Sequence, residues 1–342
     1  MRFTHPALSR TFRAFRASGA AALAAAAVAA IVPASLQAQT AAAPAWPTKA
    51  IRVMVGSPPG GPSDITSRLF ADQLQKRTGQ PVVVENKPGA GNNIAAMAAA
   101  QAEPDGYTLV VSPDTVITTN PLVYRSMSFD PKKDLVNISV LATFTQLLVC
   151  NPHVQAKTVP ELVALSKEKP MTYASGGPAV PGHLAAEMFL QSTGARMQHV
   201  PYKGPSPATT AVMGGEVDCG LLATPTALPQ VKAGKLVALA VSSAEPSPLA
   251  PDIPTLAKAL NQPDLDITFK LVLQARRGTP APVIAALEQQ AAAIMAMPDI
   301  QARLRNLDLK AVGGTSAEAE RAMQVDAARW APVVSKLGLK MD

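Results

Sequence analysis

Short apolar runs alternate along the chain with segments in which apolar residues recur at helical spacing. The apolar runs at 50–55, 81–85 and 107–112 predict strands, because each is bounded by Gly, Pro or Asn. The segments at 64–78 and 92–101 predict the helices between them, and the first ends before a glycine suited to a C-cap. This alternation of strand and helix predicts an α/β fold built on a parallel sheet.

The same alternation continues through the second half of the chain. Further strands are expected at 147–150, 171–174, 198–202, 217–222, 236–242 and 267–273. Further helices are expected at 159–167, 183–191, 208–213, 282–296 and 317–336. With 342 residues, the chain is long enough for one large domain or two medium ones.

Three of the predicted strand-to-helix loops are rich in Gly, Pro and Ser: 56–64, 175–183 and 202–208. In open α/β sheets, ligands bind at the carboxyl ends of the strands, where such loops lie. The N-terminus of a helix also favours anions, since its first N–H groups have no partner within the helix. Glycine and proline in any one loop can simply make a turn. Three loops of one kind favour a shared anion site instead.

The first of these loops nearly matches a phosphate-binding loop. Gly56 and Gly61 have the required spacing, but Pro62 and Ser63 stand where a lysine and a Ser or Thr are needed. The sequence therefore predicts a poor nucleotide site and a good site for a small carboxylate. A second glycine pair, Gly89 and Gly91, lacks the third glycine of a dinucleotide site and is interpreted as a turn before a helix.

The N-terminal segment 1–38 resembles a cleavable signal peptide. Four arginines precede an apolar stretch at 20–32, and small residues then lead to Ala38. The apolar stretch has about 13 residues, fewer than the roughly 20 that a membrane span needs. A Pro/Ala-rich linker follows at 39–47. We therefore expect a soluble protein exported to the periplasm.

Composition argues against a nucleic-acid partner. The chain has a formal charge of +7, and its leader holds four of the 31 Lys and Arg residues and none of the 24 acids. The remaining residues therefore carry a net charge of only +3, and aromatic residues make up 4% of the chain. Neither a strongly basic surface nor a stacking platform for bases is predicted.

The two cysteines, Cys150 and Cys219, lie in separate strand-like runs. Two buried free thiols are the interpretation we favour, and a disulfide is the alternative that an exported protein permits. The histidines and cysteines lack zinc-type spacing, so neither a metal nor another cofactor is predicted. No Gly-x-Ser-x-Gly motif occurs, and no catalytic residue is assigned.

Many short motifs, in order, resemble the Bug/TctC family, the extracytoplasmic solute receptors of tripartite tricarboxylate transporters. The resemblance runs from about residue 46 to the C-terminus. It is carried by WPTKAIR at 46–52, PPGGPSD at 58–64, VENKPGAG at 84–91, PDGYTL at 104–109, FDPKKDL at 129–135, AKTVPEL at 156–162, HVPYKG at 199–204, GGEVD at 214–218, AGKLVALA at 233–240, DIPT at 252–255, GTPAP at 278–282 and MPDI at 297–300.

The resemblance implies a type II periplasmic binding protein fold, with two Rossmann-like lobes that are joined by a hinge and close on a ligand. Residues 48–146 and 243–342 would form the first lobe, and residues 147–242 the second. Family ligands are small organic acids or acidic amino acids. The resemblance also implies integral-membrane transporter subunits as partners and a monomeric receptor.

Site residues follow from the resemblance by position. The first loop would grip a carboxylate through its backbone, and the loops of the second lobe would add further contacts. These residues are Gly60, Gly61, Ser63, Asp64, Ser175, Gly176, Gly182, His183, Tyr202 and Lys203. Without the resemblance, Asp64 at the start of a helix is explained by its favourable interaction with the helix dipole. His183 at a helix start is likewise explained as a cap or a spacer.

Two segments depart from the family's pattern, and both are expected to face the cleft. Leu222 follows Val217-Asp218 where many relatives have an aromatic-Asp pair, which argues against a ligand that carries an amine. Phe269 begins a segment that differs from the usual one, and the Lys270 beside it favours a second carboxylate on the ligand. Phe269 is therefore added to the predicted ligand-binding residues.

The function predicted from the sequence is a periplasmic receptor that captures a small carboxylate for a tripartite tricarboxylate-type uptake system, without enzymatic activity. One alternative is a ligand-sensing partner of a membrane sensor kinase, since the same fold serves both roles. A periplasmic hydrolase is an alternative of another class, and it would need a nucleophile and a base together in the cleft.

Overall fold

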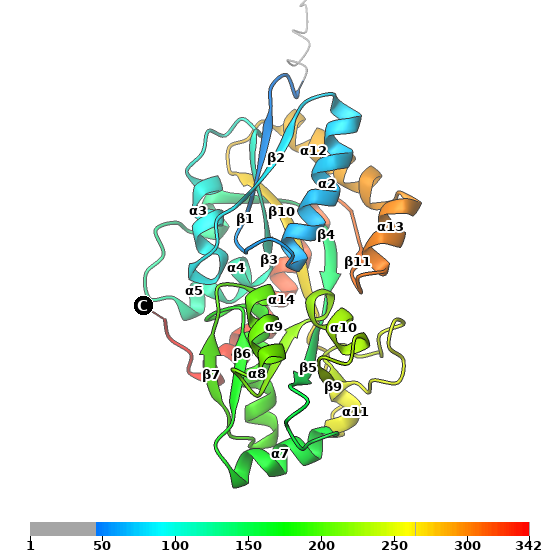
Figure 1. The fold of residues 1–342 in the computed structure, drawn as a ribbon. Coiled ribbons are helices and arrows are strands. Elements are labelled where there is room, and N and C mark those ends of the chain that lie inside the picture. Colours follow the sequence, from blue (N-terminus) through cyan, green and yellow to red (C-terminus); the bar gives the residue numbers. More distant parts are fainter. Residues whose placement is uncertain (1–45, 264, 342) are drawn as a thin grey trace, which may run out of the picture. The chain divides into compact units, whose positions relative to one another are not determined.

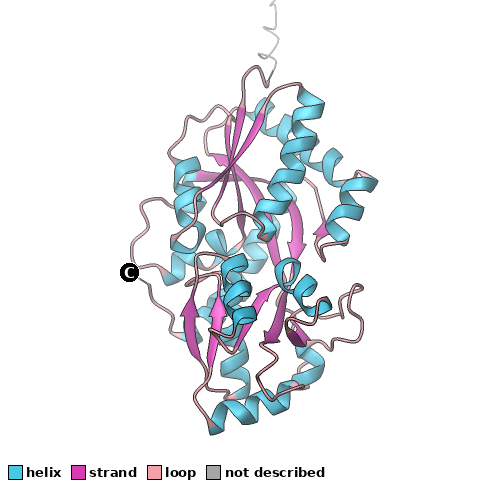
Figure 2. Ribbon diagram, viewed as in Figure 1, coloured by secondary structure: helices cyan, strands magenta, loops and turns pink. Residues whose placement is uncertain are grey.

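A computed structural model describes residues 46–263 and 265–341, in which helices surround two β-sheets (Figure 1, Figure 2). The predicted signal peptide at 1–38 and linker residues 39–45 lie outside the described residues. Each sheet gathers strands from separate parts of the chain, so we call the first sheet with its helices the first lobe, and the second sheet with its helices the second lobe.

The first sheet contains β1 (Ile51–Val55), β2 (Val82–Asn86), β3 (Thr108–Pro113), β4 (Leu135–Phe144), β10 (Phe269–Arg276) and β11 (Lys310–Ala311). Their order across the sheet is β11-β4-β10-β3-β1-β2. β1 pairs in parallel with β2 and β3, whereas β10 runs antiparallel to both β3 and β4. β11 pairs antiparallel with β4 at the edge of the sheet.

The second sheet contains β5 (Gln146–Cys150), β6 (Thr172–Ser175), β7 (Gln198–Pro201), β8 (Cys219–Ala223) and β9 (Val237–Val241). Their order is β7-β6-β8-β5-β9. β6 runs parallel to β7 and β8, and β5 runs antiparallel to both β8 and β9. The prediction of parallel sheets is therefore wrong for the inner strand β10 and the edge strand β11 of the first sheet and for the inner strand β5 of the second.

The two inner antiparallel strands, β5 and β10, lie where the chain passes between the sheets. A single residue, Thr145, separates β4 from β5, so the chain enters the second sheet without a crossover helix. The chain returns through the segment between β9 and β10. No strand was predicted at β4, whose apolar run is interrupted by Asn137 and Ser139. Asn137 is accommodated because its Oδ1 accepts a hydrogen bond of 3.0 Å from the buried Gln274 amide of β10.

The helices of the first lobe cover both faces of its sheet (Figure 1). They are α2 (Pro62–Thr78), α3 (Asn93–Ala100) with the short turn η1 (Ala90–Asn92) before it, α4 (Thr115–Thr118), α5 (Asn120–Val123), α6 (Pro131–Asp134), α12 (Ala281–Met295) and α13 (Pro298–Arg305). The second lobe has α7 (Val159–Glu168), α8 (Pro181–Thr193), α9 (Pro205–Gly214), α10 (Thr224–Lys232) and α11 (Leu256–Leu260). α14 (Ser316–Leu337) contacts β4 and α4 of the first lobe and α8 of the second.

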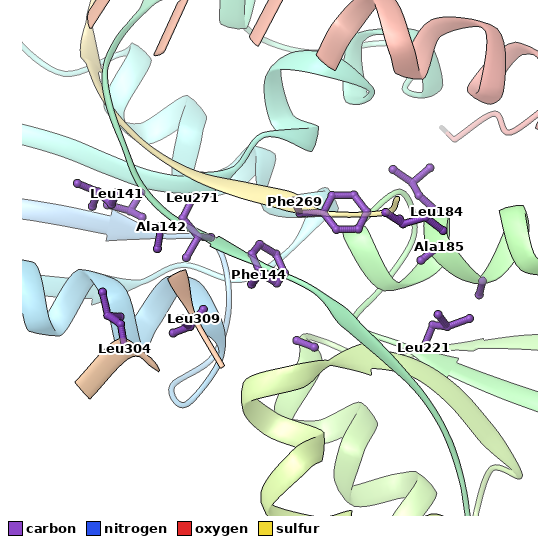
Figure 3. Close-up of a cluster of buried hydrophobic side chains, with 14 of the residues drawn as sticks. Leu141, Ala142, Phe144, Leu184, Ala185, Leu221, Phe269, Leu271, Leu304 and Leu309 are labelled. Atoms are coloured by element: carbon purple, nitrogen blue, oxygen red, sulfur yellow. The ribbon is translucent and has the colours of Figure 1, made fainter. Parts of the chain in front are cut away.

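One hydrophobic core continues from the first sheet into the second. At the passage between them, the ring of Phe269 lies 5.8 Å from that of Phe144 and stacks 5.4 Å from that of Trp330 on α14. Figure 3 shows Phe269 beside Leu184 and Ala185 of α8, with Phe144 on the neighbouring strand. These buried side chains join the lobes where the strands cross.

The cysteines form a disulfide, so the favoured interpretation of two free thiols is wrong. Cys150 on β5 is the direct antiparallel partner of Cys219 on β8, and their Cα atoms are 3.9 Å apart. The sequence placed both residues in strands but gave no register, and register is what brings the sulfur atoms together.

The predicted division into lobes at residues 146 and 242 remains a prediction. α11, which it assigns to the first lobe, packs against α7 and β9.

Candidate functional site

A cavity of about 280 Å³ lies between the carboxyl ends of strands from both sheets. Loops that follow β1, β2, β6 and β7 provide most of its wall, and the ends of β3 and β8 together with the passage from β4 to β5 provide the rest. Its lining consists of Gly56, Ser57, Pro62, Ser63, Gly89, Ala90, Gly91, Asn92, Pro113, Phe144, Gln146, Gly176, Gly177, Pro178, Val180, Pro181, Gly182, Tyr202, Lys203, Gly204, Pro205, Leu221, Leu222 and Ala223.

The N-caps of α3 and α10, Asn92 and Ala223, line this cavity. The three helices that follow the predicted loops, α2, α8 and α9, begin at it as well. Each has a proline at its first position, and none has a side-chain hydrogen bond at its N-cap. Side-chain caps do occur on α6, α7, α11 and α14, whose N-termini do not line the cavity. In the first turns, the N–H groups of Ser63 and Asp64 in α2, Gly182 in α8 and Ser206 in α9 have no backbone partner among the described residues and are available to an acceptor, whereas the His183 N–H donates to the Val180 carbonyl.

The loop before α2 is held by an ionic group that faces away from the cavity. The Asp64 carboxylate accepts hydrogen bonds of 2.9 Å from the Gly60 N–H and from the Asn86 amide. It also forms a 2.9 Å ion pair with Arg68 one turn later. Burial opposes ionisation, but these donors hold the pKa of Asp64 below its ordinary value. We call Asp64, Asn86 and Arg68 the charged bracket.

The loop before α8 is held by neutral groups. Ser175 Oγ lies 2.7 Å from His199 Nε2 and donates to the Gly177 carbonyl at 2.9 Å. His183 Nδ1 accepts a 3.0 Å hydrogen bond from the Ala179 N–H, and the two imidazole rings stack with their centroids 4.1 Å apart. We call Ser175, His183 and His199 the neutral bracket.

Burial keeps this second bracket uncharged. It lowers the pKa of His183 to about 3, with a further contribution from His199, and it lowers the pKa of His199 to about 4. Protonation of His183 would also remove the acceptor of the Ala179 N–H. Ser175 and His199 have the contact that a hydrolase needs, but Ser175 is completely buried and is absent from the cavity lining. Their contact orders the loop.

The two lobes touch beside the cavity. Ser206 Oγ donates a 3.3 Å hydrogen bond to the Pro59 carbonyl, which joins the start of α9 to the loop before α2. A Cβ atom on Gly204 would lie 2.4 Å from Pro58 Cδ, so a side chain at that glycine would force the loops apart. The lobes are therefore in contact in this structure, and the loops meet over the N-termini of α2 and α9.

Among the described residues that line the cavity, Lys203 is the one that carries a charge. Its side chain is exposed, whereas the wall opposite is apolar and includes Phe144 and Leu222. Backbone donors, a single cation and an apolar wall suit a small organic anion. Within residues 46–263 and 265–341, no group of three or more His, Cys, Asp or Glu residues could hold a metal ion.

Comparison with known proteins identifies the family. The sequence profile described as "Tripartite tricarboxylate transporter family receptor" matches residues 66–339. The chain belongs to this family. BugT of Bordetella pertussis is 30% identical over 307 residues, which cover 89% of this chain and 94% of BugT. The family assignment made from the sequence motifs is thus confirmed.

Solved structures of relatives confirm the fold. The Rpa4515 protein of R. palustris with adipate has a TM-score of 0.83 and 30% identity, with 86% of this chain and 99% of that chain covered. The periplasmic binding protein BugD has a TM-score of 0.82 and 27% identity, with 87% and 100% covered. MatC from Rhodopseudomonas palustris, with bound malate, has a TM-score of 0.79 and 26% identity, with 84% and 100% covered. This member of the receptor family has the two-lobed periplasmic binding fold.

Five of the predicted ligand-binding residues line the cavity: Ser63, Gly176, Gly182, Tyr202 and Lys203. They come from the loops before α2, α8 and α9, so the structure brings the three loops predicted from sequence to one place. Ligand contact by these residues remains a prediction, since the cavity is defined by the protein alone.

The other six predicted residues are not part of the lining: Gly60, Gly61, Asp64, Ser175, His183 and Phe269. Asp64, Ser175 and His183 belong to the brackets that hold the loops, and Gly60 donates to Asp64. A Cβ atom on Gly61 would approach the ring of Pro205 to 3.0 Å, so this glycine allows the lobes to meet. The structure thus divides the residues of the predicted loops into those that line the cavity and those that do not.

The prediction that residues 269 and 270 face the cleft is wrong for this cavity. Phe269 is fully buried between Phe144 and Trp330, as Figure 3 shows for the first pair. Lys270 makes a 2.5 Å ion pair with Asp326 of α14. The proposal that Lys270 favours a second carboxylate on the ligand therefore loses its basis. Leu222, in contrast, does line the cavity.

Sequence reasoning missed several lining residues. The turn at 89–92 was interpreted as a connection to a helix, which it is, but its residues also form cavity wall. The φ angles of 46° at Ala90 and 74° at Asn92 mark an unusual backbone, which a sequence motif alone does not reveal. Ser57 and Gln146 were also missed, since a lone Ser or Gln carries no motif.

Proposed function

We propose that this protein is a periplasmic receptor that captures a small carboxylate between its lobes and delivers it to the membrane subunits of a tripartite tricarboxylate-type transporter. The observation that carries the proposal is the meeting of three uncapped helix N-termini at one cavity. Oriented N–H groups stabilise a carboxylate without a dedicated cationic pocket. Lys203 adds a positive charge at the same site.

Capture would operate through the contact between the lobes. A ligand that binds donors from both lobes stabilises the arrangement in which they touch, and so shifts the equilibrium toward closure. Binding residues in both lobes, together with the Ser206–Pro59 contact, support this mode of action. Relatives named for adipate and malate support a carboxylate as the ligand class.

Export and partner choice are part of the same proposal. None of the helices in the described part of the chain is both long enough and apolar enough to span a membrane. The leader predicted at 1–38 would direct the protein through the inner membrane. The membrane subunits of the transporter would then recognise the closed receptor. We infer no chemical step for the receptor itself.

Native mass spectrometry of protein purified without refolding tests the proposal directly, because a captured acid is expected to co-purify. A thermal-shift panel of organic acids, amino acids and neutral analogues provides the second readout, since a ligand at 100 times its Kd adds about 2.7 kcal/mol to the free energy of unfolding. Organic acids should give the largest shifts. Stabilisation by amino acids or neutral compounds, with no effect of any acid, would refute the proposal.

Lys203→Gln provides a matched test of charge at the site. Binding of the best acid should weaken about fivefold, because an exposed ion pair contributes about 1 kcal/mol. Lys235→Gln, a substitution of an exposed lysine outside the lining, is the control and should leave affinity unchanged. Equal effects of the two variants would show that general surface charge, and not the site, attracts the acid.

A further inference from the structure

The cavity contains a buried amide with an unused donor. Gln146, the first residue of β5, is 1% exposed, and no described group accepts a hydrogen bond from its Nε2. Its backbone is fixed, since its N–H donates to Ser242 Oγ at 2.9 Å and its carbonyl accepts from the Ser242 N–H at 2.8 Å. An unpaired buried donor is unfavourable, so a ligand that accepts from it gains affinity.

This amide lies at one end of the cavity, at the start of α8. Gln146 Oε1 is 3.4 Å from where a Cβ atom on Gly182 would be, and the Leu221 carbonyl lies 2.4 Å from the same point. Leu221 and Leu222 of β8 form the adjoining wall. The one charged side chain of the described lining, that of Lys203, follows β7, and the strands β6 and β8 lie between β7 and β5 in the sheet.

The other end has a different character. Ser57, which is 7% exposed, has an Oγ without a hydrogen-bond partner among the described residues. This Oγ is 3.5 Å from where a Cβ atom on Gly61 would be, and Pro205 Cγ is 3.0 Å from that point. The N-termini of α2 and α9 therefore meet beside Ser57. Two helix N-termini, a hydroxyl and the nearby Lys203 make this the end that favours an anion.

We propose that the ligand has its carboxylate at the Ser57 end, a neutral hydrogen-bond acceptor at the Gln146 end, and an apolar body between them. This inference rests on the carboxylate receptor function proposed above. At the Gln146 end, α8 offers a single first-turn N–H without a backbone partner among the described residues, that of Gly182, so a second carboxylate there would lose more hydration than it regains beside a neutral amide and leucine side chains. A hydroxyl, carbonyl or amide oxygen there satisfies Nε2 without bringing a charge. Phe144 and Val180 line the space between.

Four six-carbon probes separate these possibilities by isothermal titration calorimetry: adipate, hexanoate, 6-hydroxyhexanoate and the monoamide of adipic acid. They share a chain length and differ only in the group at the far end. The hydroxy acid and the monoamide should bind about tenfold more tightly than hexanoate, which leaves Nε2 unpaired. They should exceed adipate by at least as much.

Substitution of Gln146 then assigns the preference to one side chain. Gln146→Met keeps the length and removes the amide, so hexanoate should bind at least as well as the hydroxy acid. Gln146→Lys places a cation at the same end, so adipate should become the best of the four probes. Gln191→Met, a substitution on the exposed side of α8, is the control and should keep the wild-type order. Thermal unfolding of each variant confirms that it is folded.

The outcomes distinguish this inference from the function on which it rests. Binding of adipate more tightly than the hydroxy acid and the monoamide by the unsubstituted protein would overturn the inference and leave the receptor function standing. An order of affinities among the four probes that Gln146→Met does not change would also overturn the inference and leave the receptor function standing. If none of the four probes binds and no acid in the wider panel stabilises the protein, the receptor function itself fails.

Discussion

The loops before α2 and α8 present the same kind of helix N-terminus to one cavity, but opposite chemistries hold them in place. The charged bracket fixes the first loop through Asp64, whose partner Arg68 has a side chain 50% exposed. The neutral bracket fixes the second loop through Ser175 and stacked histidines that lie largely inside the protein. Both brackets direct their polar side chains away from the cavity, so the backbone donors remain free for a ligand.

The comparison shows that a loop that presents a helix N-terminus to a cavity does not require one particular side-chain chemistry beneath it. It requires that the polar side chains beneath each loop form hydrogen bonds or ion pairs with one another. The two brackets should nevertheless respond differently to pH and to salt. The neutral bracket depends on histidines that stay uncharged, while the charged bracket depends on an ion pair that salt can screen. Conditions that disturb one loop should therefore leave the other in place.

The largest expected effect concerns the second lobe alone, whose sheet carries the disulfide. Replacement of both Cys150 and Cys219 by Ala should lower the free energy of unfolding by about 4 kcal/mol, since the bond closes a long loop with a sequence separation of 69. Urea unfolding of the variant measures this loss. Reductant should destabilise the original protein similarly and leave the variant unchanged. Equal sensitivity of the two proteins to reductant would contradict the disulfide's role.

The next effect is acid sensitivity of the neutral bracket. The pKa of His183 is about 3 in the folded protein and about 6.5 in the unfolded chain, so the unfolded chain takes up the proton first. Stability should therefore fall as pH decreases below about 6.5, by about 3 kcal/mol at pH 4 from this residue. In His183→Asn, Oδ1 can replace Nδ1 as the acceptor, and the fall should be smaller. Urea unfolding between pH 4 and 8 measures it, and an unchanged slope would refute the assignment.

The first lobe should respond to pH in the opposite direction because of Asp114. This residue is fully buried, and neither of its carboxylate oxygens has a hydrogen-bond partner among the described residues. Burial, and then the charge of Asp326, raise its pKa to about 7 in spite of Lys270. Stability should therefore decrease as pH rises from about 4 to 7, while the unfolded chain loses its proton.

Asp114→Asn removes that pH dependence. The variant should be about 2 kcal/mol more stable than the original protein at pH 8, after the cost of the unpaired amide is subtracted. Below pH 4, where Asp114 is protonated in both the folded and the unfolded state, the variant should instead be about 2 kcal/mol less stable, because only the cost of the unpaired amide remains. Urea unfolding at the two pH values provides the measurement. A variant that is less stable at pH 8 would show that Asp114 has a partner in the folded protein.

Sequence patterns were sufficient for the elements that carry the three loops, because apolar periodicity and Gly/Pro turns are local signals. They were insufficient for β4, whose Asn137 and Ser139 interrupt the apolar run. These residues are tolerated because the buried amide of Gln274, more than a hundred positions away, pairs with Asn137. Contacts of this kind, like the register that joins the cysteines, depend on tertiary structure and leave no trace in a local pattern.

The candidate site, like the fold, was predictable from local signals only. The loops were found, since Gly and Pro before a helix mark them, but the split between lining and supporting residues was not. Ser63 and Asp64 are neighbours in the chain, and one lines the cavity while the other forms the charged bracket. Helix geometry turns successive side chains by about 100°, so their roles depend on where the second lobe lies. Gln146 could be identified only from the structure, in which its Nε2 has no hydrogen-bond partner among the described residues.

The smallest expected effect separates the two brackets by salt. Asp64→Asn keeps an acceptor for Gly60 but loses the ion pair with Arg68, and it should cost about 1 kcal/mol in low salt. That cost should shrink in about 0.5 M NaCl, because salt already weakens the half-exposed pair in the original protein. Ser175→Ala removes a neutral contact of similar size, so its cost should be the same in both solutions. Urea unfolding of both variants at the two salt concentrations provides the test, and equal salt dependence would mean that charge does not distinguish the brackets.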